Sequence, residues 1–484
     1  MNLPAFTIAG VPWQAWLGWV WAAYALVLAV WIVLQKRSPV ATLAWIMVLG
    51  LMPVVGMAVY AGFGPQRIQR QRLKRWHGRA ALLSQDEMRT LRADRPEPPV
   101  WATQHARLIE RSCGLPMASC ASVQLLGSGA QTLDALLHAI AAARHHVHLA
   151  YYIFEPDVTG RAVLQALTAK AREGVQVCLL VDAIGSRRLC SRRGRQRELA
   201  PFLAAGGQFA VFHPARLDRF RPLVNLRTHR KLAICDGRVG FTGGINITDD
   251  ENERVRGPHA WRDTHLRLQG GAVRWLQYLF LQDWAYASGA TLPGDMLPPE
   301  PPEGSLPVQI VASGPDTDGE AIHRAMIDAI NLARERIWLA TPYFVPTEPA
   351  LLALTNAALR GVQVKLMVPQ HSDSRVVSAA ARSYFSELQR AGVLIFEYEG
   401  RMFHAKTLLV DQHYGMVGSA NFDNRSFRLN FEAAAVVYTT DFNEALARMF
   451  DRDLSHCRRV PADRRLHLGQ RLFEAVARLF SPLL

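Results

Sequence analysis

Acidic residues are missing from the N-terminal sixth of this 484-residue sequence. Residues 1–79 contain no Asp or Glu but eight Lys and Arg, so their net charge is +8. The whole chain has 55 Lys and Arg against 41 Asp and Glu, a net charge of +14, so the other 405 residues carry only +6. A basic chain favours nucleic acid or anionic lipid as a partner. Most of the excess positive charge lies in residues 1–79. The sequence around these charges therefore helps to decide between nucleic acid and anionic lipid.

Cysteine is also scarce, which disfavours two kinds of small scaffold. The chain has six Cys residues, and none of them forms a CxxC pair. A disulfide framework needs a denser set of cysteines in a short chain, and a thiolate zinc cluster needs cysteines at ligand spacing. We therefore expect reduced thiols, buried or incidental, in a part of the chain that faces the cytosol.

Charge of either sign is absent from two long N-terminal runs. Residues 13–35 and residues 40–64 contain no charged side chain, and each run is long enough to span a bilayer. Pro53 and Gly56 would break a soluble helix, whereas membrane helices tolerate them. A signal peptide followed by a core helix is disfavoured, because no Lys or Arg precedes the first run. We predict a membrane anchor over residues 1–66 with two transmembrane helices, at 13–35 and 40–64.

The basic residues beside these runs predict their orientation. Two lie between the runs, and six lie between Arg67 and Arg79. Because cytoplasmic loops carry the excess of Lys and Arg, we expect the large C-terminal part in the cytoplasm. The six charges make residues 67–105 a basic juxtamembrane segment and linker suited to anionic lipid. A solvated helix face is the alternative for the same charges.

The rest of the chain reads as two copies of one unit. ARHHVHLAYYIFEP (143–156) matches ARERIWLATPYFVP (333–346), and GVQVCLLVD (174–182) matches GVQVKLMVP (361–369). Each copy alternates helical patterns with apolar strands, which is typical of an α/β fold whose strands are buried on both faces. Repeats of this length indicate duplicated domains rather than a solenoid.

A Pro-rich stretch separates the two copies. Residues 292–304 read LPGDMLPPEPPEG, a cluster of residues that break helices and strands. The sequence therefore predicts a first domain over residues 106–291 and a second over residues 305–484.

Each copy carries the same polar motif. HRKLAICD (229–236) matches HAKTLLVD (404–411), and a small-residue turn follows each, GGIN or GSAN. The distances from His to Lys, Asp and Asn are 2, 7 and 17 residues in both copies. In a strand, residues two apart share a face, so each His and its Lys are expected together and each Asp on the opposite face. The motif residues are His229, Lys231, Asp236 and Asn246 in the first copy, and His404, Lys406, Asp411 and Asn421 in the second.

A site built from both motifs would suit phosphate chemistry. Two ammonium groups and two carboxamides are donors for phosphate oxygens. Two imidazoles suit a two-step transfer, in which one attacks phosphorus and the other protonates the leaving oxygen and then deprotonates the incoming alcohol. A metal site is disfavoured, because paired lysines repel a cation and the other acids and cysteines are not at ligand spacing. We expect neither a metal nor another cofactor.

The two motifs resemble the signature motifs of the phospholipase D superfamily. The N-terminal runs and the segments YYIFEPD, WRDTHLRLQG, SGPD, TPYFVP, NFDNRSFRLNFE and ARLFSPLL are similar to those of bacterial cardiolipin synthases. This resemblance implies two homologous phospholipase D-like α/β domains with mixed sheets packed face to face, preceded by two transmembrane helices. It also implies a multi-pass protein of the bacterial cell (inner) membrane. Its activity would be that of a phosphatidyltransferase that joins two phosphatidylglycerol molecules into cardiolipin and releases glycerol.

The resemblance also implies a role for the motif residues. One His, assigned as His229, is the nucleophile that forms a phosphatidyl-histidine, and His404 is the general acid and then the general base. The phosphate oxygens are expected to be held by Lys231, Lys406, Asn246 and Asn421.

Carboxylates outside the motifs are implied as well. The family holds each His through its other ring nitrogen by a downstream carboxylate, an orienting role known from catalytic triads. Glu432 matches in the second half, and Asp263 is the choice in the first half, with Glu251 as the alternative. Asp236 and Asp411 are counted with the catalytic motif, although strand alternation predicts that they point away from the histidines and make structural contacts.

Several alternatives remain open. A phospholipase D would pass the phosphatidyl group to water, and a phosphatidylserine-forming transferase would use another alcohol. A nucleic-acid phosphodiesterase is disfavoured, because the excess charge lies beside the membrane runs rather than in the motif-bearing part. Anionic phospholipids are therefore the expected partners, and nucleic acid is not. The acyl-chain preference and the oligomeric state are not predicted.

Two aromatic or apolar features also stay open. Tyr151, Tyr152 and Tyr343 lie near strand ends, as core or rim side chains or as substrate contacts. The tail places Leu472, Phe473, Val476, Leu479 and Phe480 on one helical face. That face suits either core packing or a helix that lies on a membrane surface.

Overall fold

The protein is described here by a computed structural model. It describes residues 7–8, 11–34, 39–52, 55–57, 60, 85–93, 95–212, 226–292, 296–297, 304–317, 319–464 and 466–481. The chain divides into two compact units, Met1–Arg67 with Arg216–Leu223, and Ile68–Ala215 with Val224–Leu484. Both copies of the repeat therefore lie in one unit. The basic stretch between Arg67 and Arg79 lies outside the described residues.

The N-terminal unit contains a short β-hairpin and two helices. Its strands are β1 (Thr7–Ile8) and β2 (Val11–Pro12), and its helices are α1 (Trp13–Val33) and α2 (Pro39–Leu51), which contact each other. Most of their apolar side chains are exposed, and Ile32, Leu49 and Tyr60 form a small buried cluster.

The two predicted membrane spans are not confirmed. No helix in the described part of the chain has the length and hydropathy of a bilayer span. The first predicted run, 13–35, coincides with α1, whereas α2 ends at Leu51 and the run predicted to reach residue 64 continues partly outside the described residues.

The larger unit is built on one mixed sheet, which has 16 strands in the described ranges. The first-half strands, in sheet order, are β3 (Met117–Leu126), β10 (His265–Gly270), β9 (Val239–Gly243), β8 (Leu232–Cys235), β4 (His146–Tyr151), β5 (Gln176–Asp182) and β6 (Gln208–Phe212). The second-half strands, in sheet order, are β11 (Leu306–Ser313), β19 (Asn430–Val437), β17 (Tyr414–Gly418), β16 (Thr407–Val410), β12 (Arg336–Ala340), β14 (Gln363–Pro369), β15 (Leu394–Tyr398) and β20 (Cys457–Arg459). The short first-half strand β7 (Arg227–Thr228) lies outside this order and pairs with β19 of the second half. Apart from the added β20, the order of equivalent strands is the same, which confirms the duplicated α/β fold.

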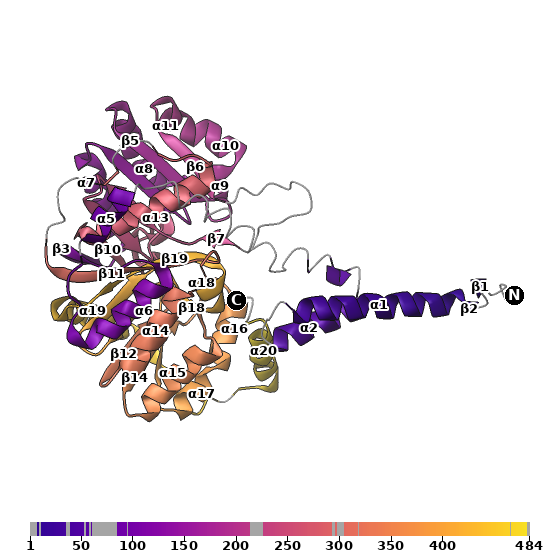
Figure 1. The fold of residues 1–484 in the computed structure, drawn as a ribbon. Helices are drawn as coiled ribbons and strands as arrows, with labels where there is room; N and C mark the ends of the chain where they lie inside the picture. The colour runs from indigo at the N-terminus through magenta and orange to yellow at the C-terminus, as the bar shows by residue number, and fades with distance from the viewer. Residues whose placement is uncertain are drawn as a thin grey trace. The chain divides into compact units, whose positions relative to one another are not determined.

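The predicted arrangement of two separate sheets needs a correction. β3 and β11 pair in antiparallel register, so backbone hydrogen bonds join the two halves into a single sheet. Figure 1 shows the two halves as lobes on either side of this junction. The halves also share a core, in which Trp275 and Phe280 of the first half are clustered with Phe403 and Phe431 of the second. The edge pairing could not be read from the sequence, because it depends on which strands meet after folding.

Helices cover the outer faces of both lobes. In the first half, α7 (Gly129–Ala142) and α8 (Val158–Arg172) pack on the strands, and α14 (Ala321–Leu332) and α15 (Glu348–Leu359) do so in the second half. Capping side chains fix where three of them begin. Ser128, Asp157 and Thr347 each accept a backbone N–H from the first turn of α7, α8 and α15, which satisfies a donor that would otherwise lack a partner.

Two further helices cover the shared core. α13 (Gly271–Ser288) follows β10, and α19 (Thr440–Leu454) follows β19 at the matching place of the second half. Between the halves, residues 292, 296–297 and 304 of the predicted Pro-rich linker are described. The predicted domain boundaries stay predictions, because both halves belong to one compact unit.

Candidate active site

The two motif segments are exchanged between the halves at the backbone level. β7 (Arg227–Thr228), just before the first motif, pairs in parallel with Asn430 and Phe431 of β19, and the His229 N–H donates to the Phe431 carbonyl at 2.8 Å. In the other half, the His404 N–H donates to the Arg262 carbonyl at 2.7 Å. Each histidine thus leads into its own strand while its backbone is fixed to the opposite half.

The same exchange holds for the side chains. His229 Nδ1 lies 3.0 Å from Glu432 Oε2, and His404 Nδ1 lies 2.7 Å from Asp263 Oδ2. The expectation that a carboxylate holds each His agrees with this geometry, and Asp263 rather than Glu251 is the first-half residue in contact with a His. The partners are crossed, however: each acid contacts the histidine of the other half. The backbone exchange explains this, since each acid is on or beside the strand that receives the opposite motif segment.

The outer nitrogen of each imidazole is free to react. Among the described residues, neither His229 Nε2 nor His404 Nε2 has a hydrogen-bond partner. Both side chains are nearly buried, with 11% and 6% of their surface exposed. Because an ionised carboxylate only accepts, each Nδ1 carries the proton and each Nε2 the lone pair. Two nucleophilic or basic nitrogens therefore belong to one buried site.

Aromatic rings flank both imidazoles. The Tyr152 ring centroid lies 4.9 Å from that of His229, and the Trp261 centroid lies 5.1 Å from that of His404. Tyr343 is 6.4 Å from His404 by the same measure. These contacts make Tyr152 and Tyr343 neighbours of the site, whereas Tyr151 is buried in the first-half core.

The two motif lysines are almost fully buried beside the histidines. Lys231 Nζ donates to the His229 carbonyl at 2.8 Å, and Lys406 Nζ donates to Asp263 Oδ2 at 3.3 Å. Burial, followed by the charge of Lys406, lowers the pKa of Lys231 to about 7, and burial also lowers the pKa of Lys406. Since the charge of Lys406 acts on Lys231, the two ammonium groups together favour an anion in the site.

The environment keeps both imidazoles neutral near pH 7 in the free protein. Burial and the charge of Lys406 lower the pKa of His404 to about 3, although Asp263 opposes them. Burial also lowers the pKa of His229, and Glu432 opposes it. A bound phosphate would add negative charge and raise both pKa values.

The supporting carboxylates stay ionised in spite of burial. Burial by itself would raise the pKa of Asp263, but Lys406 and then His404 outweigh it and lower that pKa to about 2. For Glu432, burial is likewise outweighed by His229, so its pKa is lowered. Ionised acceptors are what the proposed tautomer of each imidazole requires.

The two Asn turns are held differently. Asn246 donates its side-chain N–H to Glu251 Oε1 at 2.7 Å and its backbone N–H to Glu251 Oε2 at 3.0 Å. In the second half, the Asn421 backbone N–H donates to Ser426 Oγ at 3.1 Å. Glu251 and Ser426 each follow their Asn by five residues. Glu251 therefore fixes the Asn turn of the first half instead of orienting a histidine.

The turn residue two positions before each Asn lies against one of the carboxylates that contact the histidines. A Cβ added to Gly244 would lie 2.1 Å from Asp263 Oδ1, so only glycine leaves room for that carboxylate. At the equivalent place of the second half, Ser419 Oγ donates to Glu432 Oε2. Asn430 Nδ2 donates to the other oxygen of Glu432 at 3.1 Å. The sequence indicated a small-residue turn at both places but not these contacts.

The motif aspartates lie away from the histidines and have a structural role. Asp236 accepts three backbone N–H groups, those of Arg144, His145 and His146, at 2.8–2.9 Å. Asp411 does the same for residues 334–336. Asp236 and Asp411 come just after β8 and β16, at the strand ends opposite the histidines, as their distance along the chain predicts. Their inclusion with the catalytic residues therefore needs correction, because their oxygens are bonded to the helix–strand loop.

The site contains one group of residues with metal-ligand character. Ligand atoms of Glu251, Asp263 and His404 lie within 4.8 Å of one another. However, Asp263 already accepts from His404 and Lys406, and both oxygens of Glu251 accept from Asn246. A cation there would face the Lys406 ammonium group, so the donor set favours an anion. The absence of a metal stays a prediction.

Family comparison covers both halves and the N-terminal run. The family described as "Cardiolipin synthase, PLD-like domain" matches residues 136–256 and 326–454, and the one described as "Phospholipase_D-nuclease N-terminal" matches residues 19–65. A cardiolipin synthase of Geobacillus kaustophilus (strain HTA426) is 39% identical over 464 residues, which cover 94% of this chain and 91% of that protein. Cardiolipin synthase 1 of Bacillus anthracis is 36% identical over 486 residues, 97% of this chain and 94% of that protein.

A solved structure supports the fold alone. The crystal structure of phosphatidylserine synthase from Haemophilus influenzae Rd KW20 superposes with a TM-score of 0.59 and 13% sequence identity. It covers 79% of this chain and the whole of that chain.

Proposed function

This chain belongs to the cardiolipin synthase family with phospholipase D-like domains, and we propose that it transfers a phosphatidyl group from one phosphatidylglycerol to another. The products are cardiolipin and glycerol. The observation that carries this proposal is the pair of buried imidazoles, each with its Nδ1 against a carboxylate and its Nε2 free. Two adjacent lysines supply the positive charge that a phosphodiester needs.

The first step forms a covalent intermediate. His229 Nε2 attacks the phosphorus of the first phosphatidylglycerol and forms an N–P bond, while the P–O bond to the headgroup glycerol breaks. His404, protonated once the bound phosphate has raised its pKa, donates its proton to the leaving glycerol oxygen. Glu432 stabilises the positive charge that develops on His229, because a carboxylate at 3.0 Å favours the imidazolium form.

The second step releases the product. His404, now neutral, takes the proton of a headgroup hydroxyl on the second phosphatidylglycerol. That oxygen attacks phosphorus, the N–P bond breaks, and His229 is regenerated as neutral imidazole. His404 ends protonated, as it began the first step, so protons and bonds balance over the cycle. Lys231, Lys406, Asn246 and Asn421 hold the phosphate oxygens in both steps.

We further propose that the protein is a multi-pass protein of the bacterial cell membrane with its larger unit in the cytoplasm. Two uncharged N-terminal runs, the basic residues that follow them and the match of residues 19–65 to an N-terminal family support this proposal. Protease protection in inverted and right-side-out vesicles, with a tag after residue 484, would test the orientation. A tag accessible only from the periplasmic side would overturn it.

The activity has a direct test. Membranes that contain the protein are incubated with labelled phosphatidylglycerol as the only added lipid, and the lipids and water-soluble products are separated. Cardiolipin together with free glycerol supports the proposal. Phosphatidic acid as the only product would instead indicate a phospholipase D, and a product that appears only with added serine would indicate a phosphatidylserine-forming enzyme.

A further inference from the structure

A cavity of the second half lies outside the candidate active site. Its volume is about 950 Å³, and it is bounded by β15, β20, α16 (Arg375–Ser383) and α20 (Leu468–Leu479) of the second half. Its charged lining comprises Arg375, Arg382, Arg458, Arg459, Arg464, Glu397, Asp463 and Glu474. Five arginines against three acids make this cavity basic, and its lining includes neither His229 nor His404.

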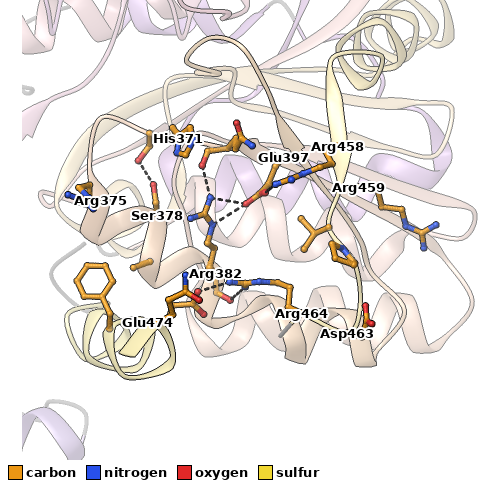
Figure 2. A pocket seen from close by; sticks show the side chains of 17 residues that line it. His371, Arg375, Ser378, Arg382, Glu397, Arg458, Arg459, Asp463, Arg464 and Glu474 are labelled. Atoms are coloured by element: carbon orange, nitrogen blue, oxygen red, sulfur yellow. Dashed lines mark hydrogen bonds and ion pairs between the residues drawn. The ribbon is translucent and has the colours of Figure 1, made fainter. Parts of the chain in front are cut away.

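The charges of this cavity are only partly compensated. Glu397 forms ion pairs with Arg382 at 3.0 Å and with Arg458 at 3.2 Å, and Glu474 pairs with Arg464 at 2.6 Å. Figure 2 shows this network along the middle and floor of the cavity.

Two arginines of the cavity are left for a ligand. Within the described residues, Arg375 and Arg459 form no ion pair, and both side chains are exposed. They lie at opposite ends of the cavity (Figure 2). Guanidinium groups without a protein partner, above a floor of compensated charge, suit phosphate oxygens.

The helix that borders the cavity carries an apolar face that points to solvent. α20 packs on α16 and buries Ala477, whereas Leu468, Leu472, Phe473, Val476, Leu479 and Phe480 are 42–80% exposed. Core packing of this face, one of the two sequence interpretations, is therefore wrong. A row of exposed apolar residues on a helix with polar residues opposite is typical of a helix at a lipid surface.

The apolar face and the basic cavity are continuous. Phe473 belongs to the exposed face of α20 and also lines the cavity. A ligand that uses both features needs an anionic head and apolar tails. Inorganic phosphate would use the arginines but leave the apolar face uncovered, and a purely hydrophobic partner would leave the arginines without counter-charge.

We propose that this cavity and the apolar face of α20 form a second binding site for an anionic phospholipid, separate from the active site. The lipid phosphate binds Arg375, on the helix against which α20 packs, and Arg459 at the other end of the cavity adds positive charge that attracts it. The acyl chains lie along Leu472, Val476 and Leu479. The site holds α20 against the anionic membrane surface. It takes no part in bond making, so it does not depend on the proposed transfer reaction.

The test is photo-crosslinking with the full-length chain in phosphatidylcholine vesicles. The vesicles contain a trace of phosphatidylglycerol with a diazirine on its acyl chain, and crosslinked peptides are mapped by mass spectrometry. A His229→Ala background prevents consumption of the probe. We expect labelling of α20, and a phosphatidylcholine probe should label it far less. Persistence of this labelling in the inactive background separates the second site from the transfer reaction.

Two variants and a matched control make the result decisive. Arg375→Ala with Arg459→Ala should reduce phosphatidylglycerol labelling of α20 about thirtyfold at limiting probe. Each basic residue near anionic lipid raises the binding affinity about fivefold, so removing two of them lowers it by about the square of that factor. Leu472→Ser with Leu479→Ser tests the apolar face and should also reduce it. Arg172→Ala with Arg193→Ala, two exposed arginines of the first half, should leave labelling unchanged.

Three outcomes would overturn the proposal. Equal labelling of α20 by phosphatidylglycerol and phosphatidylcholine probes would mean that the arginines do not select the headgroup. Full competition by inorganic phosphate without any effect of the serine variants would indicate a phosphate site and no lipid. Protein–protein crosslinks through α20 that disappear with Leu472→Ser and Leu479→Ser would identify a second copy of the chain as the occupant.

Discussion

Glu432, from the second half of the chain, lies 3.0 Å from the Nδ1 atom of His229, from the first half. Asp263 and His404 repeat this relationship in the opposite direction at 2.7 Å. Neither half therefore contains a complete imidazole–carboxylate pair of its own. Duplication alone gave two copies of a motif, and the exchange of carboxylates between the copies makes one site that needs both.

Removing either orienting charge should slow the reaction strongly. Glu432→Gln and Asp263→Asn keep the shape of the side chain but no longer stabilise an imidazolium, so we expect a fall in kcat of about 10²- to 10⁴-fold with a small change in KM. Cardiolipin formation in mixed micelles is the measurement. Histidine resonances in NMR would test the crossing: Glu432→Gln should lower the pKa of His229 and leave that of His404 unchanged. A shift confined to His404 would contradict the exchanged geometry.

The roles of the two histidines should be distinguishable with a substrate whose leaving group needs no general acid. His229→Ala should form no phosphatidyl adduct with any substrate. His404→Ala should fail with phosphatidylglycerol but form the adduct with a phosphatidyl-nitrophenol, because a nitrophenolate leaves without a proton. Trapping a phosphorus-labelled protein after rapid acid quench is the measurement. The reverse pattern, with the adduct lost only in His404→Ala, would make His404 the nucleophile.

Substrate capture should weaken as the pH rises above neutrality. Burial and Lys406 lower the pKa of Lys231 to about 7, so this lysine loses its positive charge as the pH rises through that value in the free protein. We expect kcat/KM to fall above about pH 7, while kcat, which reports the phosphate-bound state, falls only at higher pH. The arginine of Lys231→Arg stays charged throughout, so this variant should no longer show the fall in kcat/KM above about pH 7. If kcat/KM of Lys231→Arg falls in the same way above about pH 7, the titrating group is not Lys231.

Gly244 should be intolerant of a side chain for a reason specific to the site. A Cβ at this position would lie 2.1 Å from Asp263 Oδ1, so Gly244→Ala should displace that carboxylate from His404 and abolish most of the activity. Gly469→Ala, in α20, meets no atom within 4 Å and serves as the control. It should leave activity intact and change stability by less than about 1 kcal/mol. Comparable losses in both variants would remove the steric argument.

Asp236 should matter for stability more than for turnover. Its carboxylate accepts three backbone N–H groups, and Asp236→Asn should cost about 1–3 kcal/mol of unfolding free energy. Burial by itself would raise the pKa of Asp236, but the hydrogen bonds outweigh it and lower that pKa. A lowered carboxyl pKa gives stability that is present above the unfolded pKa and lost as the pH falls through the folded one. Denaturant unfolding of both proteins at neutral and acidic pH is the measurement. A large loss of kcat in the folded variant would argue for a catalytic role.

Much of the site could be predicted from the sequence because it depends on local spacing. Identical distances between His, Lys and Asn in two copies indicated a paired phosphate site before any geometry was known. Strand alternation also predicted that Asp236 and Asp411 would point away from the histidines. Which histidine each acid contacts could not be predicted from the sequence, since backbone pairing such as that of β7 with β19 joins segments about 200 residues apart and leaves no local pattern.

Composition and periodicity along the chain are enough to predict the duplication, the residue types of the site and the N-terminal charge asymmetry. Three other features are visible only in the folded chain: the halves share one sheet through β3 and β11, Glu432 contacts His229, and α20 turns its apolar face outward. These features depend on which surfaces meet once the chain has folded. An amphipathic pattern such as that of α20 is the same whether its apolar face finds a core or remains exposed.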